Sequence, residues 1–432
     1  MLAESNRNKP ASIYYFYHIA VTLLLHKQPE TACFQVSQEK NGVFDRIMEK
    51  IYLDNGATSY PKPPEVPSAV FKYMTECGTN INRGGYQSAY DLEGTVFETR
   101  ELLTEMFDGP DCKNVVFTKN VTESINVVLK GFLKQGDHIL CSSMEHNAVM
   151  RPLVQLSRFG VEFSRIPANE LGELDVKAIG GMIKSNTKAI IMTHASNICG
   201  TVNPLKEVGE ICQKHNLKFI VDTAQTAGVL PISMKEMHID VLCFTGHKSL
   251  LGPQGIGGFI LAEDMIDSVM PILTGGTGSV SHTEETPGFM PDKFEPGTMN
   301  LPGIVGLNAG LKWINERGLD KIAEHELSLT KRFIDGLKPL EDAGLVKVFG
   351  LRGTEGRTGV VSIQTLKIDC ADVAFHLDYE YGIMTRVGLH CAPNAHKTLG
   401  TFPTGTIRFS FGNFNTEKEV DAAIQALTEI CS

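Results

Sequence analysis

Residues 218–248 read KFIVDTAQTAGVLPISMKEMHIDVLCFTGHK and contain two short apolar segments, 218–222 and 240–244, each followed by polar residues. Similar apolar, β-branched segments predict strands at 114–118, 138–142, 188–193 and 257–261. Helical patterns lie between them, at 122–133 and 205–215. Strands that are apolar throughout and alternate with helices are typical of a mostly parallel sheet covered on both faces. We therefore predict an α/β fold.

The pattern changes after about residue 300. Helical stretches come first, and they precede strand-like segments at 345–349, 359–364 and 406–411. The helical stretches are 304–316 and 320–340. We expect a large α/β domain over 69–303 and a smaller α+β domain formed by 48–68 together with 304–432.

Residues 1–47 precede the first strand-like segment, 51–53. They contain an apolar run, 13–25, that is too short to span a bilayer as a helix. The run resembles the apolar region of a signal peptide, but no small-residue cleavage site follows it. We expect residues 1–47 to be an extension outside the folded domains, with Met48 as an alternative start.

The composition excludes several classes of protein. The 432 residues are 42% hydrophobic and 21% charged, which is ordinary for a soluble globular protein. The net charge of -10 provides no basic field for nucleic acid or anionic lipid, so we expect neither partner. The ten cysteines form no Cys-x-x-Cys pair and have no zinc-ligand spacing, so we expect no metal site. Scattered single cysteines fit a reducing cytoplasm.

Polar clusters follow five of the predicted strands. In a mostly parallel sheet the ligand binds beyond the carboxyl ends of the strands, so we expect these clusters to converge on one cleft. The clusters are 118–122, 145–147, 194–197, 222–225 and 245–248.

Lys248 and Asp222 indicate the chemistry of this cleft. A lysine, with a pKa of ~10.4, is protonated and a poor nucleophile at neutral pH. Desolvation, which lowers its pKa, or imine formation with an aldehyde overcomes this. Asp222 ends an apolar strand, where a carboxylate either caps a helix or keeps a pyridine nitrogen protonated. Gln225 is placed to hydrogen-bond the phenolic oxygen of such a ring, and His146 to stack on its face. Taken alone, a lysine is more often a surface residue and a histidine a structural one.

Thr122 opens the predicted helix 122–133. Free backbone N–H groups and the positive end of the helix dipole suit a phosphate there, and the alternative is a simple N-cap threonine. Thr245 and His247 lie close enough to Lys248 in the sequence to contribute to the same phosphate site.

Five segments together carry a resemblance to a known family: YLDNGAT at 52–58, SNICGT at 196–201, DTAQ at 222–225, TGHK at 245–248 and RVGLHCA at 386–392. They resemble the signature segments of class V aminotransferase-fold proteins and, more narrowly, of group II cysteine desulfurases and selenocysteine lyases. The resemblance runs from about residue 51 to the C-terminus, in the family's order. It implies fold type I of the pyridoxal 5'-phosphate (PLP) enzymes, with a mostly parallel, seven-stranded sheet in the large domain.

The resemblance also implies how PLP is bound. Lys248 would carry the Schiff base, and three side chains would contact the ring: Asp222 at the pyridine nitrogen, Gln225 at the phenolic oxygen and His146 on the face. The phosphate would lie at Val121, Thr122, Thr245 and His247. Thr298 would reach the phosphate of a neighbouring subunit, which implies a homodimer.

The implied reaction moves sulfur from L-cysteine to Cys391 as a persulfide and leaves L-alanine. Lys248, Cys391 and His146 would be the catalytic residues. A protein sulfur acceptor would be the further partner, in sulfur metabolism such as iron–sulfur cluster assembly. Arg386, shortly before Cys391, favours the reactive thiolate. The substrate would be held by Ala57, Asn197, Arg386 and Arg408, with the planar guanidinium of Arg408 suited to a carboxylate.

Two positions depart from the family pattern. Val121 replaces a threonine, so one hydroxyl contact to the phosphate is missing, and Leu389 replaces the first histidine before Cys391. The second change leaves open the proton handling near Cys391 and the identity of the acceptor. Three alternatives also remain: a selenocysteine lyase, a transaminase or β-lyase of the same fold, and a non-catalytic PLP-binding or sulfur-relay protein.

Overall fold

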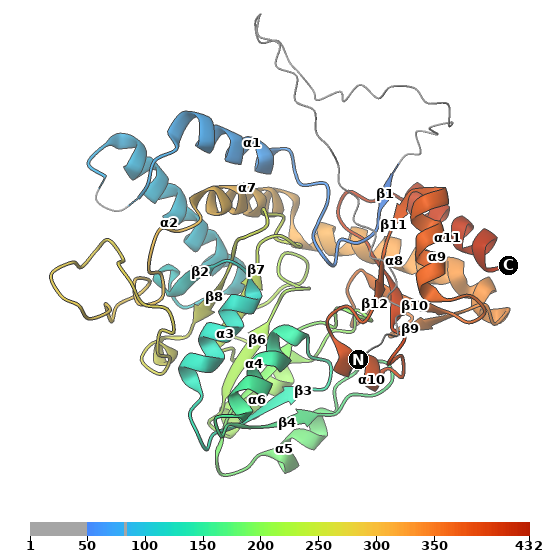
Figure 1. The fold of residues 1–432 in the computed structure, drawn as a ribbon, viewed down its shortest axis with the longest axis horizontal. Coiled ribbons are helices and arrows are strands. Elements are labelled where there is room, and N and C mark those ends of the chain that lie inside the picture. The colour runs from blue at the N-terminus through green and yellow to red at the C-terminus, as the bar shows by residue number, and fades with distance from the viewer. Residues whose placement is uncertain (1–49, 82–83) are drawn as a thin grey trace, which may run out of the picture. The chain divides into compact units, whose positions relative to one another are not determined.

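The computed structural model describes residues 50–81 and 84–432 (Figure 1). A seven-stranded sheet has the order β2-β8-β7-β6-β5-β3-β4. The β3–β4, β3–β5, β5–β6 and β6–β7 pairs are parallel, and β8 is antiparallel to both its neighbours, so the predicted mostly parallel sheet is confirmed. Its strands are β2 (Val115–Thr118), β3 (His138–Ser142), β4 (Glu162–Ile166), β5 (Thr187–Thr193), β6 (Lys218–Asp222), β7 (Val241–Thr245) and β8 (Gly257–Leu261).

Alternate residues of each central strand enter two different cores, one on each face of the sheet. In β6, Phe219 and Val221 pack into one core, and Ile220 packs into the other. Because both faces are covered, the strand shows no polar alternation, as predicted. The edge strand β4 was missed because Glu162 and Arg165 are exposed and interrupt its apolar pattern.

Helices cover both faces of this sheet (Figure 1). The first core includes side chains of α2 and α6 together with α7, and the second includes side chains of α3 and α4. The helices up to α7 are α1 (Glu65–Lys72), α2 (Gln87–Phe107), α3 (Val121–Phe132), α4 (Asn147–Ser157), α5 (Ile179–Met182), α6 (Leu205–Lys214) and α7 (Leu301–Arg317). Short turns of other helix types lie at Tyr73–Cys77, Cys112–Asn114, Val176–Ala178 and Glu263–Met265.

The start of α3 differs by one residue from the prediction. Asn120 is the N-cap, its side chain accepting a hydrogen bond from the Glu123 backbone at 3.0 Å, and the helix begins at Val121. Thr122 therefore lies within the first turn and does not open the helix. An asparagine is as good a cap as a threonine, so the local pattern allowed both registers.

The C-terminal part of the chain forms a second, antiparallel sheet with the order β12-β13-β10-β9. A two-residue strand near the start of the described chain, β1 (Ile51–Tyr52), pairs in parallel with β11 (Ile383–Met384). The remaining strands are β9 (Val346–Phe349), β10 (Val360–Thr365), β12 (Arg386–Gly388) and β13 (Thr406–Ser410). The remaining helices are α8 (Leu319–Asp342), α9 (Cys370–Tyr381), α10 (Pro393–Thr398) and α11 (Glu417–Cys431).

This second sheet has a core of its own. Leu53 packs there with Phe333 of α8, Phe409 of β13 and Leu427 of α11. The buried side chains of α7 belong instead to the core of the large sheet. The division into a large domain (69–303) and a small domain (48–68 with 304–432) remains a proposal; the two separate cores support it except at α7, which packs with the large sheet.

The predicted extension, 1–47 with its apolar run 13–25, and the alternative start at Met48 lie outside the described residues. Among the helices that are described, none combines the length and apolarity needed to cross a membrane.

A buried ion pair ties α2 to the segment that carries Thr298. Arg100 and Glu295 meet at 2.7 Å, and both side chains are almost inaccessible to solvent. Glu295 also accepts the backbone N–H of Phe117 at 2.7 Å, and the Arg100 guanidinium lies 4.6 Å from the centre of the Phe117 ring. The segment after Glu295 is therefore anchored to β2 as well as to α2.

We expect Glu295→Met to lower the free energy of unfolding by roughly 3–5 kcal/mol, because it leaves the Arg100 charge buried without a partner. The Arg100→Met, Glu295→Met double variant should lose less, since no unpaired charge remains. Denaturant titration of the three proteins measures this. Equal losses in the single and double variants would contradict the prediction.

Candidate functional site

The predicted polar clusters lie at one edge of the seven-stranded sheet. Asp222 is the last residue of β6 and Thr245 the last of β7. His194 directly follows β5, and His146 begins α4 just after β3. These strands are neighbours in the order β7-β6-β5-β3 and run parallel, so their ends adjoin one another.

Lys248 lies three residues beyond β7 with its side chain largely buried. Burial lowers the pKa of its amine to about 8, because an ammonium ion is poorly solvated there. The nearby Asp222 carboxylate opposes this shift, and Arg408 adds to it. Lys248 is therefore within electrostatic range of both, and a larger fraction of its amine is neutral near neutral pH than in an ordinary lysine.

The backbone at His247 and Lys248 is held by the segment 58–62. The carbonyl of His247 accepts hydrogen bonds from Thr58 Oγ1 at 3.1 Å, Ser59 N at 3.1 Å and Lys62 Nζ at 2.7 Å. Ser59 Oγ donates to the carbonyl of Lys248 at 2.7 Å. No local sequence pattern marks Ser59 and Lys62, since only tertiary contact shows that they meet the lysine loop.

Asp222 and Gln225 lie in the same turn after β6. Asp222 accepts the backbone N–H of Ala224 at 2.9 Å, and burial raises the pKa of its carboxyl. Gln225 donates through Nε2 to the carbonyl of Gly56 at 3.1 Å, which joins this turn to the segment 54–58.

His146 is the N-cap of α4. Its Nδ1 accepts the backbone N–H of Ala148 at 3.0 Å, so the neutral ring carries its proton on Nε2. Burial lowers its pKa to about 4, with Lys248 and Arg408 contributing, and the ring is neutral at physiological pH.

Glu145, part of the predicted polar cluster 145–147, is fully buried beside His146. It accepts the backbone N–H of Thr193 at 3.0 Å and the hydroxyl of Ser142, and so bridges β3 and β5. Burial raises its pKa to about 8, and it is mainly protonated at neutral pH.

Two buried polar atoms close to Lys248 have no hydrogen-bond partner among the described residues: Thr245 Oγ1 and His247 Nδ1. Burial lowers the pKa of His247 to about 4. The other expected phosphate residues differ from each other: Val121 packs its side chain into the core, whereas Thr122 is exposed at the first turn of α3.

Arg408 lies on β13 and is almost completely buried. It pairs with Asp54 at 2.5 Å and donates to the carbonyl of Asn197 at 3.2 Å, and its Nε has no partner among the described residues. Arg386, about half exposed, lies 3.8 Å from the other Asp54 oxygen. Asp54, which the sequence analysis did not single out, therefore holds both arginines. Ala57 lies in the turn that follows Asp54.

Cys391 is exposed and follows β12 in a loop. His390 and Cys391 both adopt left-handed backbone conformations, with φ values of 45° and 58°. The Cys391 carbonyl accepts the backbone N–H of Asn147 at 2.8 Å, and the His390 carbonyl accepts Asn197 Nδ2 at 2.9 Å. The loop is thus bonded to residues at the ends of β3 and β5, beside His146.

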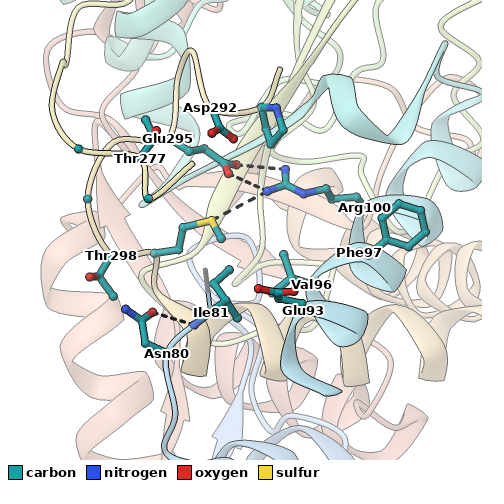
Figure 2. Close-up of a pocket in the computed structure, with 15 residues that line it drawn as sticks. Asn80, Ile81, Glu93, Val96, Phe97, Arg100, Thr277, Asp292, Glu295 and Thr298 are labelled. Carbon is teal, nitrogen blue, oxygen red and sulfur yellow. Dashed lines mark hydrogen bonds and ion pairs between the residues drawn. The ribbon is translucent and has the colours of Figure 1, made fainter. Parts of the chain in front are cut away.

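Thr298 is exposed and lines two cavities. One, of about 320 Å³, is also lined by Thr118 and Lys119 of the predicted polar cluster 118–122. The other has a volume of about 460 Å³, and its walls include Asn80, Phe97 and the Arg100–Glu295 pair (Figure 2). None of the other predicted cofactor or substrate residues lines this cavity.

The sequence pattern of the aminotransferase class-V family matches residues 51–423. The chain belongs to this family. A probable cysteine desulfurase of Pyrococcus abyssi is 34% identical over 88% of this chain and 94% of its own length. A cysteine desulfurase of Haloferax volcanii is 30% identical over 87% of this chain and 88% of its own length.

Two solved structures of cysteine desulfurases have the same fold. The apo structure of a cysteine desulfurase from Thermococcus onnurineus has a TM-score of 0.83 at 34% identity, and the match covers 88% of this chain and 94% of that one. A cysteine desulfurase from Escherichia coli has a TM-score of 0.78 at 28% identity, covering 89% and 96%. The fold type predicted from the resemblance is therefore confirmed.

We expect the Lys248 amine, in protein freed of any ligand on this residue, to titrate near pH 8. Acetic anhydride labels only the neutral amine, so labelling of Lys248 should rise through pH 8 while N-acetyl-lysine amide in the same tube follows the ordinary pKa of ~10.4. Mass spectrometry of the Lys248 peptide across pH measures this. Coincident curves for the two amines would rule out the desolvated environment.

Proposed function

We propose that this chain is a PLP-dependent cysteine desulfurase, which converts L-cysteine to L-alanine and transfers the sulfur to Cys391. The observation that carries the proposal is the loop of Cys391, bonded through Asn147 and Asn197 to the same sheet edge as Lys248 and Asp222. The relatives named as cysteine desulfurases support it.

The residues at this edge fit PLP. Thr245 Oγ1 and His247 Nδ1 are buried polar atoms without a partner among the described residues, as a phosphate site requires. Lys248 would bind the aldehyde carbon. Asp222 would pair with the pyridine nitrogen, Gln225 would bond the phenolic oxygen and His146 would lie against the ring. When bound, PLP supplies an electron sink for the α-carbon of the substrate.

The chain's own residues would then carry the reaction. Arg408 and Asn197 bind the substrate carboxylate, with Arg386 and Ala57 at the mouth. Lys248, once displaced by the substrate amine, takes the α-proton, which its lowered pKa of about 8 permits near neutral pH. The Cys391 thiolate attacks the substrate sulfur, so that an S–S bond forms as the C–S bond breaks. The carbon skeleton keeps the electron pair, gains protons and leaves as alanine.

We expect Lys248→Ala to lose the borohydride-reducible PLP adduct, because no other lysine of this chain is assigned to the aldehyde. Cys391→Ser should keep the adduct, still bind L-cysteine, and lose nearly all sulfide release, because serine cannot accept sulfur. Sulfide and alanine assays, with mass spectrometry of the Cys391 peptide, measure both.

A Cys391→Ser enzyme that desulfurates L-cysteine at the parent rate would make the chain a β-lyase or transaminase. The same assays with L-selenocysteine and with a keto acid test the selenocysteine lyase and the transaminase directly. Selenide release should depend less on Cys391, because selenium is the better leaving group.

We also propose that the enzyme is a cytoplasmic homodimer. Thr298 would complete the partner's phosphate site, which agrees with its place in a cavity separate from Lys248. Phe97 lines this cavity, and Tyr90 lies seven residues earlier on α2; they are 53% and 57% exposed and are suited to burial against a second copy. The scattered single cysteines fit a reducing compartment.

The dimer proposal predicts that the parent sediments as a dimer and that Tyr90→Glu with Phe97→Glu sediments as a monomer with weakened PLP retention. The matched control is Phe375→Glu with Tyr379→Glu, a pair of exposed, stacked aromatics on α9. Analytical ultracentrifugation and PLP absorbance measure the outcome. A monomeric parent with full PLP occupancy would overturn the dimer.

A further inference from the structure

Three arginines line one surface pocket beside the loop of Cys391. The pocket has a volume of about 440 Å³, and its arginines are exposed: Arg151 from α4, Arg158 at the C-cap of α4 and Arg165 from β4. Asn147 also lines the pocket, and its backbone N–H donates to the carbonyl of Cys391 at 2.8 Å. Asn394, in the helix directly after Cys391, lines it too, so the pocket adjoins the loop.

Arg151 of α4 and Arg158, its C-cap residue in the helical conformation, form a stripe that leads away from Cys391. Residues 147, 151, 154 and 158 are spaced by four, three and four positions, which places them on one face of a helix. At 1.5 Å per residue, Arg151 and Arg158 lie about 6 Å and about 16 Å along the axis from Asn147. Val154, between them, is also exposed, so the stripe combines charge with a small apolar contact.

None of these three arginines makes an ion pair with a carboxylate of the described residues. By contrast, five other arginines do: Arg100, Arg332, Arg352, Arg386 and Arg408. The Arg165 guanidinium lies 5.1 Å from the centre of the Phe163 ring instead. Three free guanidinium groups in one pocket are unexpected on a chain with a net charge of -10. A guanidinium binds a carboxylate through two parallel hydrogen bonds, so this surface suits an acidic ligand.

We propose that Arg151, Arg158 and Arg165, with Val154, form a docking surface for an acidic patch on the protein that accepts sulfur from Cys391. The inference rests on the proposed function, since a persulfide on Cys391 must be removed before the next turnover. The acceptor's thiolate attacks the outer sulfur of the persulfide. One S–S bond forms, the other breaks, and Cys391 leaves as a thiolate, so the exchange needs no external oxidant or reductant.

Two synthetic peptides of equal length test the proposal, one with a single cysteine flanked by glutamates and one with the same cysteine flanked by glutamines. The PLP-loaded dimer should bind the glutamate peptide about tenfold more tightly at low ionic strength. The preference should disappear near ~1 M salt, where the Debye length falls to ~3 Å. Fluorescence anisotropy measures binding with the cysteine blocked, and mass spectrometry measures sulfur transfer from preloaded Cys391 with the cysteine free.

Arg158→Glu with Arg165→Glu should abolish the preference in both measurements. Arg151 is left in place because its charge also acts on His146. The matched control is Lys206→Glu with Lys321→Glu, exposed residues outside the pocket that change the net charge equally, and it should keep the preference.

The outcomes separate the docking surface from the proposed function. Equal binding of the two peptides by the parent, or an equal loss in the lysine control, would overturn the docking surface. The unsubstituted protein could instead prefer the glutamate peptide as expected but form neither alanine nor a Cys391 persulfide. That result would overturn the desulfurase function and the link to sulfur transfer. Release of sulfide to dithiothreitol should be unchanged in both variants, because a small neutral thiol needs no docking.

Discussion

Neighbouring parallel strands must end at the same edge of their sheet, and the arrangement of this protein depends on that constraint. Asp222 and Thr245 end β6 and β7, and the loop of Lys248 continues from β7. His146 follows β3 at the same edge. Residues separated by about a hundred positions thereby become neighbours.

The second sheet contributes Arg408 and the loop of Cys391 to the site, and hydrogen bonds join the two sheets. Arg408 comes from β13 and reaches the carbonyl of Asn197 after β5. Asn197 in turn bonds the His390 carbonyl, so the loop of Cys391 is tied to the large sheet. Asp54 holds Arg408 at 2.5 Å and so joins the first strand segment to the same cluster. The site therefore depends on both cores being folded.

Burial decides the charge of the groups at this edge. It lowers the pKa of Lys248 to about 8 and those of His146 and His247 to about 4, and it raises that of Glu145 to about 8. In each case the poorly solvated charged form is disfavoured. Neutral amine, imidazole and carboxyl groups are consequently available near neutral pH. The arginines beside Cys391 are exposed instead, which suits them to an external partner.

The sequence alone determined the central strands, the cluster of polar residues after each, and the family, because these depend on local apolar runs and short motifs. It missed β4, whose exposed edge interrupts the apolar pattern, and it started α3 at Thr122, since Asn120 and a threonine cap equally well. Only the tertiary structure showed that Lys62 and Ser59 hold the lysine loop, that Asp54 pairs with Arg408, and that three arginines adjoin Cys391. Those contacts join segments far apart in the chain, and no local pattern encodes a distance between side chains on different elements.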